Sequence, residues 1–183
     1  ETTQLSVRYG INTGDFLVQP SLSDSRIGMP TGQKHYTESL RGRKFRVASP
    51  SFFQVNLQQL DCLLGLVKQR LKLSGEEIVV DAYSGVGTFP AIFASLVKGV
   101  ISLEESKSST SDSEINNSSI PNITIMTGKA EDLIDKYGIN KFDVLISTEL
   151  LEHVLNWKRC IHNFPFKICK STIYSICSSY WKK

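Results

Sequence analysis

Three acidic residues stand at the ends of short apolar runs in the middle of the chain, where their side chains could hold a polar ligand. Asp81 closes the first run, Glu104 closes the second, and Glu131 follows the third. Between the first two lies a small-residue turn, Ala82–Gly87, which precedes an apolar helical stretch. Such a turn leaves backbone N–H groups free at a helix N-terminus, and its glycines let a ligand approach the chain closely. The pattern predicts a nucleotide site.

The residue types at this turn separate two classes of nucleotide. A dinucleotide-binding turn carries three glycines in G-x-G-x-x-G, whereas the third position here is Pro90. A carboxylate at Asp81 would repel a pyrophosphate but suits the ammonium of a methionyl group. Glu104 can accept hydrogen bonds from both ribose hydroxyls, and Glu131 falls where an adenine edge would be read. Each acid alone could equally be a helix cap or a surface residue, but together they predict S-adenosylmethionine.

The elements that must position these residues alternate between strand and helix from residue 78 onwards. Their apolar runs lack polar alternation, as expected of strands covered on both faces. We therefore expect an α/β fold with a doubly wound, mainly parallel sheet. The expected strands are 78–80, 100–103, 123–126, 142–146 and 172–176, and the expected helices are 88–97, 130–137 and 149–161. Residues 105–119 include seven Ser, and we expect the helix due there to be frayed or lost.

The first part of the chain has a different character. Residues 4–9 and 15–19 are strand-like and flank a turn, so they predict a β-hairpin, whereas 20–42 reads as loop or linker. Hydrophobic residues from Phe52 onwards recur at steps of three and four and predict a helix that runs to Leu71 or Leu73. We expect a small β appendage and linker at 1–45 and one domain at 46–183, short at its C-terminal end.

Three strings carry a resemblance to a known family. They are Phe45-Arg46-Val47-Ala48-Ser49-Pro50-Ser51-Phe52-Phe53-Gln54-Val55-Asn56, Asp81-Ala82-Tyr83-Ser84-Gly85-Val86-Gly87-Thr88-Phe89 and Leu103-Glu104-Glu105-Ser106. The chain resembles the S-adenosylmethionine-dependent RNA uracil-5-methyltransferases, the type acting on 23S rRNA or tRNA, over residues 4–146. The resemblance implies a Rossmann-like class I methyltransferase fold. It also implies that Gln54, from the helix before the first strand, contacts the cofactor together with Tyr83 and Glu104. The complete expected cofactor set is Gln54, Asp81, Tyr83, Gly85, Gly87, Glu104, Glu131 and Ser147.

The sequence diverges from the family after residue 146. Ser147 stands where the family carries the Asp of an Asp-Pro-Pro-Arg motif, and Ser84 replaces a Cys of the family turn. The string Glu149-Leu150-Leu151-Glu152-His153-Val154, with Trp157 beyond it, instead resembles class I methyltransferases acting on other acceptors. Glu152 and His153 could serve there as acid or base, or simply lie on a helix surface.

The family reaction needs a thiolate and a base. The thiolate adds to uracil C6 so that C5 becomes nucleophilic, and a base later removes the C5 proton. Cys177 stands at the position of the family cysteine, although a buried inert thiol is an alternative. No candidate for the family's Glu base follows it in this sequence. Methyl transfer to RNA uridine is the leading expectation, with a different acceptor or a catalytically inactive RNA-binding or cofactor-binding remnant as alternatives.

Charge is unevenly distributed along the 183 residues. Residues 26–72 hold nine Lys or Arg against two acids, and residues 153–183 hold six against none. If these segments meet in space they suit an RNA backbone, and otherwise they are separate solvated faces. No membrane span is expected, because the most apolar stretch, 79–103, contains Asp81, Lys98, Pro90 and three glycines. No metal site is expected, because the four cysteines form no C-x-x-C pair and lack His partners at zinc spacing. A cytoplasmic location is expected, since the first residues have no signal-peptide pattern.

Overall fold

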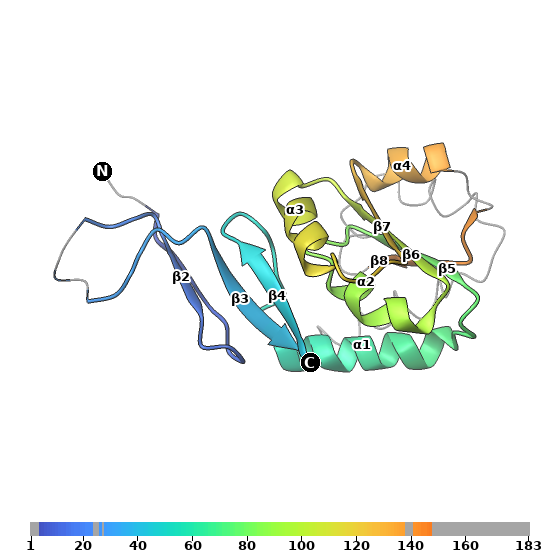
Figure 1. The fold of residues 1–183 in the computed structure, drawn as a ribbon, viewed down its shortest axis with the longest axis horizontal. Coiled ribbons are helices and arrows are strands. Elements are labelled where there is room, and N and C mark those ends of the chain that lie inside the picture. Colours follow the sequence, from blue (N-terminus) through green and yellow to red (C-terminus); the bar gives the residue numbers. More distant parts are fainter. Residues whose placement is uncertain (1–3, 24–25, 27, 138–140, 148–183) are drawn as a thin grey trace, which may run out of the picture.

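A parallel sheet of four strands forms the centre of the molecule (Figure 1). The computed structural model describes residues 4–23, 26, 28–137 and 141–147. The strand order is β7-β6-β5-β8, and every neighbouring pair is parallel. The strands are β5 (Ile78–Ala82), β6 (Gly99–Glu104), β7 (Ile123–Thr127) and β8 (Val144–Ser147). The predicted α/β fold with a parallel sheet is confirmed.

Helices cover both faces of this sheet, as the apolar strands require. One face packs on α1 (Leu57–Leu71), α2 (Thr88–Phe93) and the short 3₁₀ turn η1 (Ala94–Leu96). The other face packs on α4 (Ala130–Tyr137), which the sequence predicts at these same bounds. Alternate strand residues divide between the two cores, so Val79 lies on the α1 face and Val80 on the α4 face.

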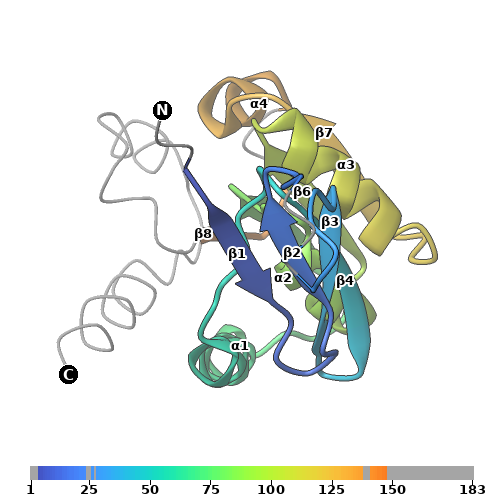
Figure 2. The same cartoon turned by 90° about the vertical axis from the view of Figure 1, so that its left-hand side faces the viewer.

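Two antiparallel hairpins precede the sheet and lie beside it, as both views show (Figures 1 and 2). The first, β1 (Ser6–Tyr9) with β2 (Phe16–Gln19), is the predicted one. The second, β3 (His35–Leu40) with β4 (Arg43–Ala48), begins within the stretch 20–42 predicted as loop or linker, so that prediction is wrong for residues 35–42. Its two-residue turn has positive φ at Arg41 (50°) and Gly42 (76°). Such turns usually have Asn-Gly or Asp-Gly at these two positions, and the Arg-Gly present here is not a recognisable turn sequence.

The sequence of β3 also lacks the apolar alternation typical of a strand, because one of its buried positions is an acid. Tyr36, Glu38 and Leu40 alternate as buried residues along β3. The Glu38 carboxylate accepts backbone N–H bonds from Ile11 (2.8 Å) and Asn12 (3.1 Å) in the turn of the first hairpin. Because these bonds compensate its burial, an acid can occupy an inward position of a strand. The same contacts join the two hairpins.

The Ser-rich segment forms a regular helix, α3 (Lys107–Asn116), so the expectation of a frayed or lost helix is wrong. The Ser106 side chain caps it by accepting the Ser109 N–H at 3.3 Å. Its buried face is polar rather than apolar: Ser109, Thr110, Asp112 and Ser113 are all buried. This face packs against β4, β6 and β7. Hydrogen bonds to that surface replace the hydrophobic stripe on which the sequence-based expectation depended.

Helix α1 begins later than its hydrophobic pattern suggests. Asn56 caps it by accepting the Gln59 N–H at 3.1 Å, so residues 52–55 precede the helix. Phe52 and Val55 are 66% and 78% exposed, and their part in the periodicity is coincidental. The placement of Gln54 on this helix is therefore wrong. The predicted helix 149–161 and strand 172–176 lie outside the described residues.

Candidate functional site

The site predicted from the sequence lies at the carboxyl ends of the strands. The strand order reverses beside β5, because β6 and β7 follow on one side of it and β8 pairs with its other side. In parallel sheets this is the position at which ligands bind. The turn after β5 passes through three positive φ angles: Tyr83 (62°), Gly85 (56°) and Gly87 (83°). Glycine adopts such angles readily, whereas a non-glycine residue at Tyr83 costs about 1–3 kcal/mol and must be held by its surroundings.

Tyr83 is held by an acid at the start of α4, the helix that follows β7. Its hydroxyl donates a 2.8 Å hydrogen bond to Oε1 of Glu131, in the first turn of α4. The half-buried ring packs on the α4 core. Two of the residues predicted as a cofactor set are thus in direct contact, although 48 positions separate them in the sequence.

Glu104, the last residue of β6, joins the glycine turn to the start of α3. One carboxylate oxygen accepts the Gly85 N–H at 2.8 Å, and the other accepts the Ser106 N–H at 2.8 Å. A carboxylate has about four acceptor positions, so two remain for a ligand. The structure therefore brings Glu104 and Gly85 together and leaves the acid with capacity for ribose hydroxyls.

Asp81 lies beneath the turn and is only 3% exposed. Its Oδ2 atom is buried without a hydrogen-bond partner among the described residues. Burial raises the pKa of this carboxyl well above its usual range, and the nearby Glu104 carboxylate raises that pKa further. The Asp81 and Glu104 carboxylates are therefore near enough for their charges to interact, and burial favours the neutral form of Asp81 relative to an exposed aspartate.

A pair of hydroxyls that the sequence analysis did not single out supports the turn. Ser102 Oγ, fully buried on β6, donates to Ser84 Oγ at 2.6 Å. The Ser84 N–H donates to the Leu103 carbonyl at 3.0 Å. Ser84 stands at the position where the family carries Cys, and a serine in the interior of the neighbouring strand is the one sequence signal that could have indicated the pair.

Gln54 lies in the segment between β4 and α1, which passes close to the glycine turn. The preceding Phe52 carbonyl lies 3.9 Å from the position that a Cβ on Gly85 would take. The half-buried Gln54 side chain accepts the Asn56 N–H at 3.4 Å. A non-helical segment therefore carries Gln54, and this segment approaches the glycine turn at Phe52.

The remaining predicted site residues are less informative. Ser147 ends β8 opposite Ala82, and its buried Oγ has no hydrogen-bond partner among the residues described. Cys177 lies outside the described residues, as do Glu152 and His153. The described residues therefore include the expected cofactor-binding residues but not the expected catalytic cysteine.

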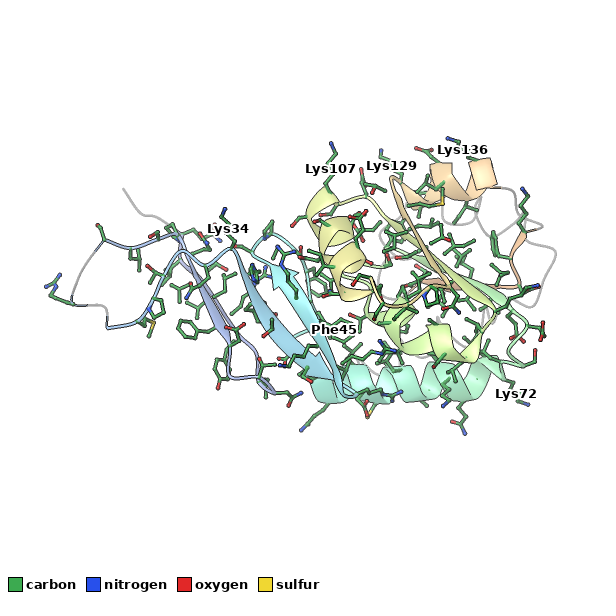
Figure 3. The ribbon with its side chains drawn as sticks, viewed as in Figure 1. Lys34, Phe45, Lys72, Lys107, Lys129 and Lys136 are labelled. Carbon is green, nitrogen blue, oxygen red and sulfur yellow. The ribbon has the colours of Figure 1, made fainter. Side chains whose placement is uncertain are left out.

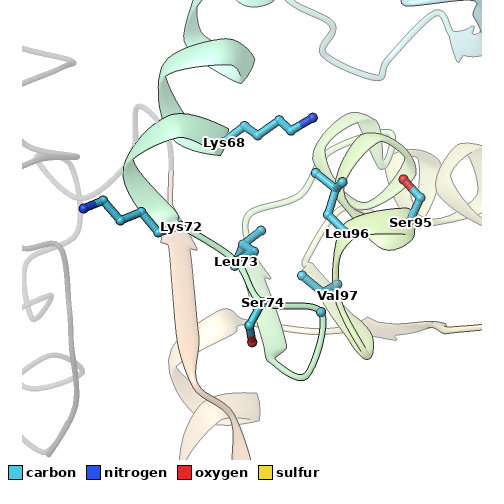
Figure 4. A pocket seen from close by; sticks show the side chains of 8 residues that line it. Lys68, Lys72, Leu73, Ser74, Ser95, Leu96 and Val97 are labelled. Atoms are coloured by element: carbon cyan, nitrogen blue, oxygen red, sulfur yellow. The ribbon is translucent and has the colours of Figure 1, made fainter.

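A separate pocket of about 400 Å³ lies near the amino ends of β5 and β6 (Figure 4). It is lined by Lys68, Lys72, Leu73, Ser74, Gly75, Ser95, Leu96 and Val97. Ligands of parallel sheets bind at the opposite, carboxyl end of the strands. Because the predicted acids are at that other end, this pocket is not part of the candidate site.

Within the described residues, no group of three or more His, Cys, Asp or Glu side chains is arranged to hold a metal ion. None of the helices within the described ranges has the length and apolar character needed to cross a bilayer.

Comparisons with known proteins identify the type of fold. The chain matches no protein-family model. It is 37% identical over 107 residues to an uncharacterized RNA methyltransferase of Enterococcus faecalis, a match that covers 57% of this chain and 23% of the relative. The chain thus spans about a quarter of the length of the curated relatives it matches.

Solved structures of methyltransferases have the same fold. One is the Pyrococcus abyssi tRNA (uracil-54, C5)-methyltransferase in complex with S-adenosyl-L-homocysteine, with a TM-score of 0.55 and 22% identity, covering 77% of this chain and 42% of that one. Another is M. jannaschii TYW2 in complex with AdoMet, with a TM-score of 0.52 and 14% identity, covering 77% and 60%. The chain has the Rossmann-like class I methyltransferase fold, and its predicted resemblance to RNA methyltransferases is confirmed over more than half of its residues.

Proposed function

We propose that this chain binds S-adenosylmethionine at the carboxyl ends of β5, β6 and β7. The observation that carries the proposal is the Glu104 carboxylate, which is fixed by the Gly85 and Ser106 amides and retains free acceptor positions. These positions suit the two ribose hydroxyls. Glu131, oriented by the Tyr83 hydroxyl, would accept from the adenine amino group. The unpartnered Oδ2 of Asp81 would pair with the methionyl ammonium.

The full protein is proposed to methylate RNA uridine at C5, in 23S rRNA or tRNA. S-adenosylmethionine supplies a methyl group activated by its sulfonium sulfur. In this proposal the Cys177 thiolate adds to uracil C6, C5 takes the methyl group, a base removes the C5 proton, and the C6–S bond breaks to release Cys177. The resemblance of the Ser51–Asn56 string and of the glycine turn to uracil-5-methyltransferases supports this acceptor.

RNA is the proposed partner, through the basic segments 26–72 and 153–183. The curated relatives named RNA methyltransferases support this partner. Exposed Lys107 and Lys129 follow closely on the ends of β6 and β7, and they lie on the same side of the molecule in Figure 3. Cations at this rim could contact phosphates next to the cofactor. A cytoplasmic location stays a prediction.

Calorimetric titration with S-adenosylhomocysteine tests the cofactor proposal. The unmodified chain should bind it, and Glu104→Gln should raise Kd at least tenfold, because a charged acceptor of the ribose hydroxyls is lost, which corresponds to about 1.4 kcal/mol or more. Glu105→Gln is the matched control, since this exposed neighbour makes no contact with the glycine turn among the interactions described. Absence of binding at millimolar ligand would overturn every methyltransferase assignment of this chain.

Incubation with RNA that contains 5-fluorouracil tests the acceptor and the nucleophile. Fluorine at C5 cannot leave as a cation, so the C6 adduct should accumulate as a stable protein–RNA conjugate. The conjugate should disappear in Cys177→Ala and persist in Cys62→Ala, whose exposed thiol lies on α1. A conjugate that forms equally in both variants would exclude Cys177 as the nucleophile.

Ser147 favours a second candidate, a class I methyltransferase with a different acceptor. Its buried hydroxyl stands where the uracil-5 family uses a carboxylate, and a serine cannot supply that charge. Methylation of another acceptor by the full protein, with no conjugate on fluorinated RNA, would support this candidate over uridine methylation.

A further inference from the structure

The polar face of α3 connects two parts of the proposed cofactor site that are far apart in the sequence. One part is the glycine turn, and the other is the segment from Arg46 to Asn56 that carries Gln54. In Figure 1, α3 lies between the second hairpin and the parallel sheet. Among the elements described, no helix packs more extensively on a strand than α3 does on β4.

Asn116, in the last turn of α3, makes the direct link. Its Oδ1 accepts the Arg46 N–H at 2.7 Å. Its Nδ2 donates to the Arg46 carbonyl at 3.0 Å and to the Val86 carbonyl at 3.0 Å. Both protons of the amide are therefore used, one on β4 and one on the glycine turn. One side chain thus bridges the backbones of the two parts.

Asp112, one turn earlier on α3, fixes the segment that leads to Gln54. Its Oδ2 accepts the Ala48 N–H and the hydroxyl of fully buried Ser51, both at 2.7 Å. Its Oδ1 pairs with the Arg46 guanidinium at 3.2 Å. These contacts set the start of the Ser51–Asn56 segment, three residues before Gln54.

The end of α3 also lies directly on the glycine turn. Asn117 Nδ2 donates to the Gly87 carbonyl at 3.3 Å. A Cβ at Gly87 would come within 2.2 Å of that nitrogen and 2.3 Å of Ser113 Oγ. The separation between helix and turn is therefore fixed by close contact, and Asn116 acts across a rigid interface.

We propose that Asn116 is a positioning residue for the S-adenosylmethionine site, one that holds the Gln54 segment at a fixed distance from the glycine turn. The inference rests on the proposed cofactor site. It assigns a function to the Ser-rich helix, which neither the glycine motif nor the acids at the strand ends involve. Gln54 would contact the cofactor from one side and the turn from the other, so their separation determines affinity.

Two variants of Asn116 test the proposal by separating affinity from stability. Asn116→Ala removes all three hydrogen bonds. Asn116→Asp has the same shape and keeps the acceptor for the Arg46 N–H, but loses both donated bonds, to the Arg46 and Val86 carbonyls. Both should raise Kd for S-adenosylhomocysteine about tenfold, which corresponds to about 1.4 kcal/mol, because the Gln54 segment is no longer held against the glycine turn. Glu114→Ala, exposed on the same helix, is the control and should leave Kd unchanged.

Hydrogen exchange provides a measurement that needs no ligand. In both variants, amides in 49–56 and 83–88 should exchange faster, whereas those of β6 should not change. A lower melting temperature with unchanged Kd would show a merely structural role and overturn the inference, as would faster exchange confined to α3. Failure of the unmodified chain to bind S-adenosylhomocysteine would instead overturn the proposed function, with the exchange result still reporting on the link.

Discussion

At the scale of single residues, burial of the Asp81 carboxyl costs free energy that the folded chain must offset elsewhere. An acid in this position has lost its hydration, and Oδ2 gains no hydrogen bond in return among the described residues. Its raised pKa results first from burial and then from Glu104. Proteins keep such groups where a ligand will compensate them, so the cost of Asp81 is consistent with a cation-binding role.

Asp81→Asn is expected to stabilise the folded chain at neutral pH. The raised pKa means that the folded state binds more protons than the unfolded state, so stability falls as pH rises above the unfolded pKa of the group. Asparagine removes this dependence. The melting temperature should rise by a few degrees at pH 7, which corresponds to about 1 kcal/mol, and by less at pH 4.

The same substitution should weaken binding of S-adenosylhomocysteine, because the ammonium loses its counter-ion. Differential scanning fluorimetry at the two pH values and calorimetry measure the two effects. An equal gain in melting temperature at both pH values would contradict the assignment of the cost to ionisation. Unchanged affinity would place Asp81 outside the binding site.

At the scale of elements, the glycine turn depends on α3 as much as on its own residues. Gly87 has φ 83° and lies against Ser113 and Asn117. The Gly42 turn of the second hairpin has a similar φ of 76°, but a Cβ there would meet open space. The two glycines therefore differ in packing while they share a backbone conformation.

Gly87→Ala should lower the free energy of unfolding more than Gly42→Ala does. The hairpin variant carries only the conformational cost, about 1 kcal/mol. The turn variant adds overpacking against α3, typically a further 1–3 kcal/mol. Urea unfolding of the two variants gives the comparison. Equal losses would show that α3 moves away at little cost.

The turn that leads into β5 is held by a second acid, Glu77. The Ser74 hydroxyl and amide donate to its carboxylate, and they lower its pKa to about 2 from a usual value near 4.5. The sign is opposite to that of Asp81: the stabilisation is present above the unfolded pKa and is lost as the pH falls through about 2.

Ser74→Ala should move the Glu77 pKa upwards towards its usual value, since the hydroxyl bond is the largest cause of the shift. NMR titration of the Glu77 carboxyl carbon measures the change directly. Ser95→Ala, at an exposed position of η1, is the control. A Glu77 pKa that stays low in the Ser74 variant would assign the shift to the backbone amides.

At the scale of the whole molecule, the hairpins and the sheet share one hydrophobic core. Leu17 of β2, Phe45 of β4, Leu64 of α1 and Val79 of β5 belong to the same buried cluster. Figure 3 shows Phe45 between the hairpin and α1, and its ring lies 5.9 Å from that of Phe53. The division into an appendage at 1–45 and a domain at 46–183 stays a prediction. Because residues from both parts belong to one buried cluster, this division needs to be tested.

Leu17→Ala is expected to destabilise the entire chain by about 2–5 kcal/mol, because it opens a cavity in that shared core. Val7→Ala in the same hairpin should change stability by less than about 0.5 kcal/mol, since Val7 is 62% exposed. Thermal unfolding followed by circular dichroism should show one transition that shifts as a whole for Leu17→Ala. A second transition, or a hairpin that melts alone, would support an independent appendage.

Most of the sheet could be predicted from the sequence because its signals are local. Short β-branched runs, the glycine turn and the amphipathic segment 130–137 each specify an element from neighbouring residues alone. The second hairpin and α3 could not be predicted in this way. Glu38 and Asp112 occupy buried positions that look unfavourable until their partners, Asn12 and Ser51, are brought near by the fold.

The sequence by itself determined which strand ends carry acids, since the order of residues along the chain fixes where each strand stops. Only the tertiary structure decided that Glu104 binds the Gly85 amide, that Asp81 is buried beneath the turn, and that Asn116 joins β4 to the turn. The physical reason is that a polar group is stable in the interior only when its partners are present. Here those partners stand up to 70 positions away, as Asn116 does from Arg46.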